Sequence, residues 1–235
     1  MKLLSIVILS ISLLSASATK ATLGNTKQLI VVKSANWTTP NATLQRFEKR
    51  PKGWQQVGKT IQVVIGKNGL GWGIGLHKIP KNAKYIKREG DGKAPSGVFR
   101  LKNGFGYQPY SIKFPYSVYR STDHCVDDSN SKWYNQIVDS TKIKIDYSSY
   151  ESMKFAKNYY KYGIVVDHNP NHIPKAGSCI FMHIKKPNKI PTVGCTAMSQ
   201  SEIKEILKWL DPSKHPLLIQ APEDEIKRLL PFKTK

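Results

Sequence analysis

Short apolar stretches bounded by glycine, proline or asparagine recur along the chain from residue 28 onward. This pattern is typical of β-strands. It predicts strands over residues 28–33, 43–49, 59–65, 162–167, 178–184 and 217–220. The Asn68-Gly69 pair stands between two apolar runs and predicts a hairpin turn at residues 67–70. The chain is therefore predicted to be mainly β.

One helix is specified in detail after residue 198. Ser199 and Glu202 have the spacing of a capping box, and Asp211 before Pro212 ends the segment. The apolar residues that share one face at helical spacing are Ile203, Ile206, Leu207 and Leu210. Weaker patterns predict helices over residues 150–160 and 223–230, so we expect two or three helices.

The segment 104–135 is rich in aromatic and turn residues and has no clear periodicity. A connection of this length in a compact domain is commonly functional. We expect it to form a structured functional loop or lid.

Residues 1–21 have the features of a secretory signal peptide. Lys2 precedes an apolar stretch, and small residues that suit cleavage follow it at 15–18. The stretch is too short to span a bilayer, although an uncut N-terminal anchor is the alternative. We expect an exported protein of the periplasm or cell wall, with residues 22–235 as one domain, its core at about 28–220, and no membrane span after cleavage.

The chain is strongly basic, with 37 Lys and Arg against 16 Asp and Glu and a net charge of +21. Such a charge favours anionic partners, and an anionic cell wall is one for an exported protein. A solvated lysine surface without one partner is the alternative. Because arginine is scarce and no binding motif occurs, we do not expect a nucleic acid as partner.

The chemistry points to residues 178–210. There His183 ends a predicted strand, a basic loop follows, and Thr192-Val193-Gly194-Cys195 precedes the capped helix. Backbone N–H groups near a helix start can lower the pKa of a thiol and hold an oxyanion. A thiol nucleophile also needs a base, and His183 is the candidate. From spacing alone, a cysteine and a histidine twelve residues apart are more often structural.

Four blocks make the interpretation more specific. They read GDGKAPSGVFRL at 90–101, VDDSNS followed by YN at 126–135, GSCIFMH at 177–183 and PTVGCTAM at 191–198. In this order they resemble the L,D-transpeptidase catalytic domain (YkuD) family, in particular a proteobacterial-type branch with a Pro-Thr-x-Gly-Cys motif. The resemblance covers about residues 28–220 and implies a β-sandwich with two or three helices.

The resemblance also implies an activity on peptidoglycan stem peptides, which serve as donor and acceptor. Cys195 would form a thioester with the donor, and His183 would act as general base and acid. The backbone carbonyl of Ile184 would orient the imidazole, and the N–H groups of Gly194 and Cys195 would hold the oxyanion. The products would be cross-links or stems with an exchanged terminal D-amino acid, and no cofactor or metal is needed.

Departures from the family pattern affect substrate contacts. Many members have a histidine where this chain has Val193, and an arginine where it has Ala197. Thr192, Lys185 and Lys186 are the candidate substrate-binding residues that remain. The lysines suit the free carboxylates of stem peptides, and a solvated loop is the alternative.

Two other functions stay open. An L,D-carboxypeptidase that trims stems would use the same catalytic residues. A non-catalytic basic protein that binds the cell wall would have an unreactive Cys195.

Other histidine and cysteine residues have plainer interpretations. His168 and His172 are separated by Pro170, so a surface loop pair is expected rather than metal ligands. The cluster at residues 124–128 is expected to shape a loop. Cys179 lies inside a predicted strand, and whether it is a buried thiol or pairs with Cys125 stays open.

Overall fold

The computed structural model describes residues 23–154, 156–230 and 232. The predicted signal peptide, 1–21, lies outside the described residues. The strands are β1 (Gln28–Ser34), β2 (Asn41–Arg50), β3 (Gly53–Val64), β4 (Leu70–Trp72), β5 (Ala94–Gly106), β6 (Tyr116–Val118), β7 (Asp123–Val126), β8 (Ile137–Asp139), β9 (Tyr150–Ser152), β10 (Tyr162–Val166), β11 (Phe181–Ile184), β12 (Thr196–Met198) and β13 (Leu217–Pro222). The helical elements are α1 (Gln200–Trp209), α2 (Glu223–Leu229) and the short 3-10 turns η1 (Pro187–Lys189) and η2 (Pro212–Lys214). The predicted mainly β class with two or three helices is confirmed.

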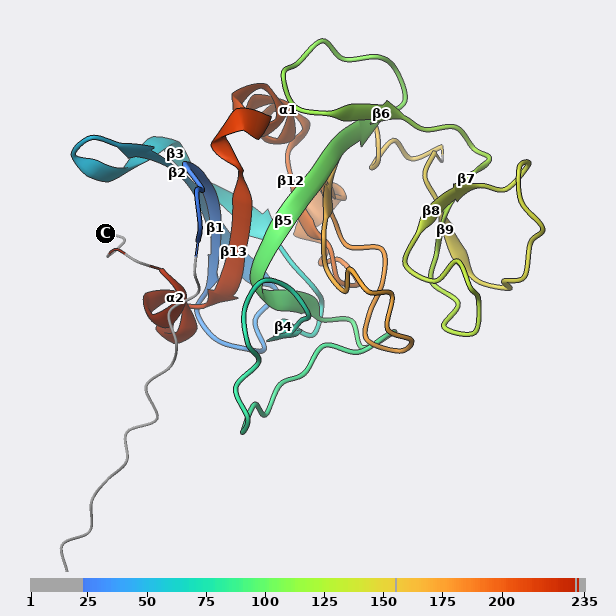
Figure 1. Ribbon diagram of the computed structural model, residues 1–235, viewed down its shortest axis with the longest axis horizontal. Helices are drawn as coiled ribbons and strands as arrows, with labels where there is room; N and C mark the ends of the chain where they lie inside the picture. Colours follow the sequence, from blue (N-terminus) through green and yellow to red (C-terminus); the bar gives the residue numbers. More distant parts are fainter. Residues whose placement is uncertain (1–22, 155, 231, 233–235) are drawn as a thin grey trace, which may run out of the picture.

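Ten strands form the main sheet, which carries one helix at each end of the core (Figure 1). Its order is β10-β11-β12-β3-β2-β1-β13-β5-β4, and β6 pairs with β5. Strand β5 also pairs with β10, so the sheet folds over onto itself as a sandwich. The central strand β1 is buried on both faces, because Ile30 and Val32 join one core cluster and Leu29 and Val31 join another.

Helix α1 begins and packs as its sequence predicts. Ser199 Oγ accepts a hydrogen bond from the Glu202 N–H, and the Glu202 carboxylate accepts one from the Ser199 N–H. The apolar face of the helix packs into the first core cluster beside Ile164 of β10 and Met182 of β11. The helix therefore packs against β10 and β11, the two strands that precede the 185–195 loop.

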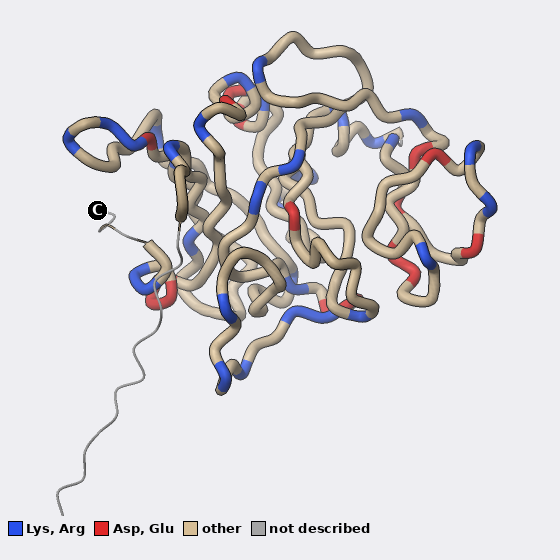
Figure 2. Tube along the Cα trace, in the orientation of Figure 1, with Lys and Arg blue, Asp and Glu red and all other residues tan. Residues whose placement is uncertain are grey.

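A second, three-stranded sheet in the order β8-β7-β9 stands beside the main one (Figure 1). It carries much of the acidic charge of a basic protein (Figure 2). Residues 123–152 contain six of the 16 acidic residues but only three of the 37 basic ones. The segment 104–135, predicted as one structured loop, contains β6 and β7 and leads into this small sheet.

Two local predictions are wrong. Asn68 and Gly69 do form a turn, with the Gly69 N–H donating to Gly66 O at 2.8 Å, but β3 pairs with β2 and β12 while β4 pairs with β5. The turn is therefore not a hairpin. The described part of residues 150–160 is not helical, because Tyr150–Ser152 pair with β7 and Asn158 has a left-handed φ of 57°.

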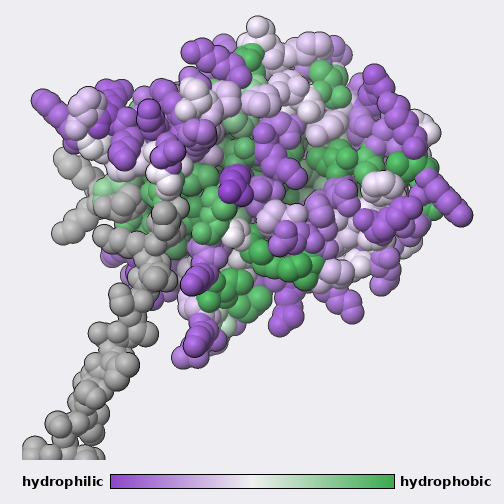
Figure 3. Space-filling model, in the orientation of Figure 1, coloured by the Kyte–Doolittle hydropathy of each residue, from purple (hydrophilic) through white to green (hydrophobic). Residues whose placement is uncertain are grey.

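The surface in Figure 3 is mostly hydrophilic, with apolar atoms in small separate groups. Within residues 23–154 and 156–230, no helix is both long and apolar enough to cross a membrane.

Candidate active site

Cys195 lies directly before β12, next to the strand that carries His183. Strands β11 and β12 run parallel, with His183 opposite Ala197 in the register. Thr192 fixes the turn that leads to the cysteine, since its Oγ1 donates to Cys195 O at 2.6 Å and accepts the Gly194 N–H at 3.2 Å. The predicted nucleophile and base thus come from neighbouring strands of the main sheet.

The Cys195 sulfur is buried and held by two backbone groups. The Phe181 N–H donates to Sγ at 3.3 Å, and Sγ donates to Cys179 O at 3.6 Å. Burial raises the pKa of the Cys195 thiol far above its ordinary value, and the carboxylate of Glu151 raises it further. The Phe181 N–H lowers this pKa, but burial outweighs its effect, and β12 separates Cys195 from the start of α1.

His183 has a defined tautomer. Its Nδ1 lies 2.8 Å from the carbonyl oxygen of Ile184, and since a carbonyl only accepts, Nδ1 carries the proton. Nε2 is then free of a proton and can accept one. Burial, helped by Lys186 and opposed by the hydrogen bond to Ile184, lowers the pKa of His183 to about 4, so the imidazole is neutral at neutral pH. The resting pair is a neutral thiol with a neutral imidazole.

Two cavities meet at Cys195. The larger, of about 600 Å³, is lined by Cys195 and His183 together with Glu151, Tyr159, Tyr160 and Lys186. The smaller, of about 220 Å³, is lined by Cys195, Gly194, Glu89, Asp127, Glu151 and Lys87, among others. Cys195 therefore lines both cavities.

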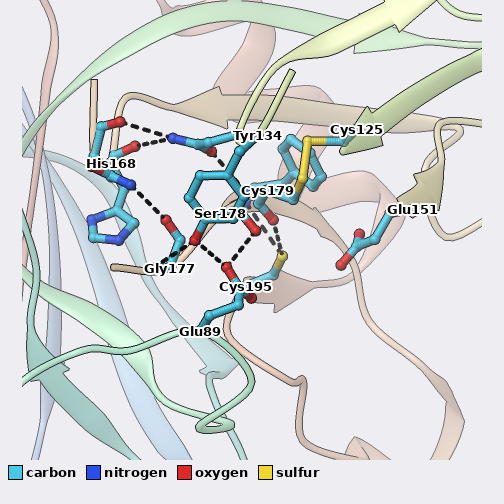
Figure 4. Close-up of a disulfide and its surroundings, with 12 residues drawn as sticks. Glu89, Cys125, Tyr134, Glu151, His168, Gly177, Ser178, Cys179 and Cys195 are labelled. Carbon is cyan, nitrogen blue, oxygen red and sulfur yellow. Dashed lines mark hydrogen bonds between the residues drawn. A yellow bond between two sulfur atoms is a disulfide. The ribbon is translucent and has the colours of Figure 1, made fainter. Parts of the chain in front are cut away.

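A disulfide joins Cys125 to Cys179 and ties β7 to the loop before β11 (Figure 4). Cys179 is not inside a strand, because its φ is 54° and β11 begins only at Phe181. Its N–H donates to Asn135 Oδ1 at 3.0 Å. The disulfide therefore holds the carbonyl that contacts the Cys195 sulfur.

The same loop is held by a buried polar network (Figure 4). Glu89 accepts hydrogen bonds from the hydroxyls of Tyr134 and Ser178, and the Gly177 N–H donates to the Tyr134 hydroxyl at 3.0 Å. The block at 126–135 thus supports the chain that leads into β11 and, through Asp127, lines the smaller cavity.

Of the candidate substrate-binding lysines, Lys186 lines both the larger cavity and a neighbouring groove, whereas Lys185 lines only the groove. Lys186 lines the larger cavity, where its ammonium lies 5.9 Å from the centre of the Tyr159 ring. Lys185 and Lys189 line this groove, beside η1. Thr192 lines the larger cavity with Cys195.

His168 is not a surface residue, which corrects the expectation of an exposed histidine pair. It is buried, its Nδ1 accepts the Ile74 N–H at 3.3 Å, and its Nε2 donates to Ala176 O at 3.1 Å. Across the described part of the chain, no three His, Cys, Asp or Glu side chains are grouped as metal ligands.

Sequence reasoning missed Glu151 and Tyr160. The Tyr160 hydroxyl donates to the Glu151 carboxylate, and the Tyr160 ring lies edge-on to His183 with centroids 5.2 Å apart. Both residues fall in the segment mistaken for a helix. If residues 150–152 had been predicted as a strand, Glu151 would have drawn attention.

A family model described as the L,D-transpeptidase catalytic domain (YkuD) matches residues 41–219. The chain therefore belongs to this family, whose members are L,D-transpeptidases that act on peptidoglycan. Among solved structures, the chain is similar to Bd1075 of Bdellovibrio bacteriovorus, with 14% identity, a TM-score of 0.42 and coverage of 88% of this chain. The chain spans 53% of that protein's solved chain, about half its length. No curated protein matches.

Proposed function

We propose that the protein is an exported cysteine L,D-transpeptidase that acts on peptidoglycan stem peptides. The observation that carries the proposal is that Cys195 and His183 line one cavity from neighbouring strands, with the His183 tautomer set by Ile184 O. The periplasm or cell wall is the compartment where this substrate occurs. The charge of +21 would hold the protein on an anionic wall.

In the first half-reaction, His183 Nε2 accepts the thiol proton as Cys195 Sγ attacks the carbonyl carbon before the terminal D-amino acid. The C–S bond forms, the C–N bond breaks, and the D-amino acid leaves with the proton from His183. The N–H groups of Gly194 and Cys195 are the proposed oxyanion donors. The Gly194 N–H must leave Thr192 Oγ1 for this role.

In the second half-reaction, an acceptor attacks the thioester. A stem-peptide amine gives a cross-link, a free D-amino acid gives an exchanged stem, and water gives a trimmed stem. The last outcome would make the protein an L,D-carboxypeptidase.

Mass spectrometry of the purified protein with disaccharide-tetrapeptides tests the proposal, with Cys195→Ala as the control. We expect cross-linked dimers and a thioester adduct on the wild type only. Loss of D-Ala without dimers would favour the carboxypeptidase. If neither the wild type nor Cys195→Ala changes the substrate, the protein is not a transpeptidase of these stems. Binding of the intact cell wall by both proteins would then indicate the non-catalytic alternative.

A further inference from the structure

Glu151 faces the reacting sulfur from outside the two strands that carry Cys195 and His183. It lies on β9, directly opposite Cys125 of β7, so the disulfide and the small sheet fix its position. It lines both cavities that meet at Cys195. Figure 4 shows its carboxylate on the side of the Cys195 sulfur, and the Tyr160 hydroxyl hydrogen-bonds to both groups.

The two oxygens of Glu151 have different surroundings. The Tyr160 hydroxyl donates to Oε2 and anchors the carboxylate. Oε1 takes no part in this hydrogen bond. One oxygen is therefore fixed, and the other can accept a hydrogen bond from a molecule in the cavity.

Three carboxylates and four lysines line the two cavities, and the carboxylates gather on the side of the small sheet and Glu89. The small sheet is an acidic region of a lysine-rich protein (Figure 2). Glu89 and Asp127 line the smaller cavity with Glu151. The basic groups that line these cavities are Lys67, Lys87, Lys157 and Lys186. Lys87 is occupied by Asp91 at 2.7 Å, and the Lys186 ammonium lies over Tyr159.

We infer that the Glu151 carboxylate binds the ammonium group of the acyl acceptor and takes one of its protons before the amine attacks the Cys195 thioester. This inference rests on the proposed function and assigns a base to its amine acceptor. Most amines are protonated at neutral pH and cannot attack until a proton is removed.

The step balances as follows. The ammonium transfers a proton to Glu151, and the amine nitrogen uses its freed electron pair to form a bond to the thioester carbon. The C–S bond breaks, and sulfur leaves with its electron pair. The second nitrogen proton passes to His183 Nε2 and returns to Sγ, which leaves an amide and a neutral thiol. Glu151 then loses its proton to solvent.

The protonation behaviour of Glu151 supports this role. Burial raises its pKa to about 7, with Asp127 and Glu89 acting in the same direction and the Tyr160 hydroxyl against it. A base with a pKa near the working pH transfers protons most effectively.

The test compares wild type with Glu151→Gln, which keeps the shape and the contact with Tyr160 but cannot take a proton. Mass spectrometry measures the ratio of cross-links formed to D-Ala released from disaccharide-tetrapeptides. We expect this ratio to fall at least tenfold in Glu151→Gln and to recover in part in Glu151→Asp. Asp139→Asn is the matched control, because it removes one charge from the same small sheet away from both cavities and should leave the ratio unchanged.

Hydroxylamine, which is largely unprotonated at neutral pH, separates proton transfer from structural damage. Glu151→Gln should form the hydroxamate at a rate within about threefold of wild type. An unchanged cross-link ratio, or equal losses with stem amines and hydroxylamine, would overturn the role of Glu151. A wild type that releases no D-Ala and forms no adduct would refute the proposed function itself.

Discussion

The backbone N–H of Phe181 donates a hydrogen bond to the sulfur of Cys195 at 3.3 Å. Phe181 begins β11, and His183 follows it two residues later on the same strand. One strand therefore holds the sulfur directly and presents the imidazole. This explains how a cysteine outside any helix terminus is kept in register with its base.

The Cys195 thiol should be slow to react with general alkylating reagents, because burial raises its pKa and favours the neutral form. Cys195 is the single free cysteine of the described chain, so the intact mass reports its labelling directly. We expect iodoacetamide to label it at least tenfold more slowly at pH 7.5 than after unfolding in urea, with a rate that keeps rising to pH 10. A rate that levels off below pH 8 would instead indicate a thiolate–imidazolium pair.

Removing the Cys125–Cys179 disulfide should destabilise the fold. The bond closes a separation of 54 residues, for which chain entropy gives a loss of about 4 kcal/mol. We expect urea unfolding of the Cys125→Ser/Cys179→Ser variant to show a free energy lower by about 2–4 kcal/mol. Dithiothreitol should lower the free energy of unfolding of the wild type by a similar amount and leave that of the double variant unchanged. A difference below about 1 kcal/mol between wild type and the double variant would count against a structural role of the disulfide.

Local features were the most predictable part of this fold. Short apolar stretches bounded by turn residues identified β1, β2, β3, β10 and β13, and the capping box identified the start of α1. These signals need only neighbouring residues. Cys195 and His183 were found through ordered blocks of sequence, and the structure places them around one cavity.

Features that depend on distant contacts were not predictable. The turn at Asn68-Gly69 has the right chemistry, but β4 pairs with β5 rather than with β3. Pairing with β7 turns residues 150–152 into a strand and brings Glu151 to the site. The Cys125–Cys179 bond required a Cα distance of 5.9 Å that no spacing reveals.

The stability of the protein should fall as the pH drops from about 7 to 4.5. Burial lowers the pKa of His168 and of His183 to about 4, so below their ordinary value of 6.5 the unfolded chain takes up protons that the folded chain does not. Each histidine then removes on the order of 3 kcal/mol from the free energy of unfolding. Glu151, with a pKa raised to about 7, acts in the opposite direction over pH 7 to 4.5 and offsets the stability loss from about one histidine.

Urea unfolding at pH 7 and at pH 4.5 measures this balance. His168→Gln should be less stable than wild type at pH 7, because it loses contacts with Ile74 and Ala176, and it should lose less stability on acidification. Glu151→Gln should lose more than wild type, since the opposing group is gone. If the free energy of unfolding changed equally with pH in the three proteins, the pKa values of His168 and Glu151 would not be shifted as described.

Lys186 should contribute to binding of the donor stem, whose free carboxylates are anionic. Its ammonium is at the cavity with Cys195, whereas Lys185 lines the neighbouring groove, so we expect the larger effect from Lys186. Lys186→Met should raise KM about fivefold, equivalent to about 1 kcal/mol for an exposed ion pair, with kcat little changed. Steady-state release of D-Ala at low salt measures both constants, and the difference from wild type should shrink in high salt because exposed charges are screened.

Lys227→Met, on the exposed side of α2, is the control for loss of one positive charge. Equal effects of the Lys186 and Lys227 variants would show that only the overall charge matters, and a fall in kcat alone would place Lys186 in the chemical step rather than in binding.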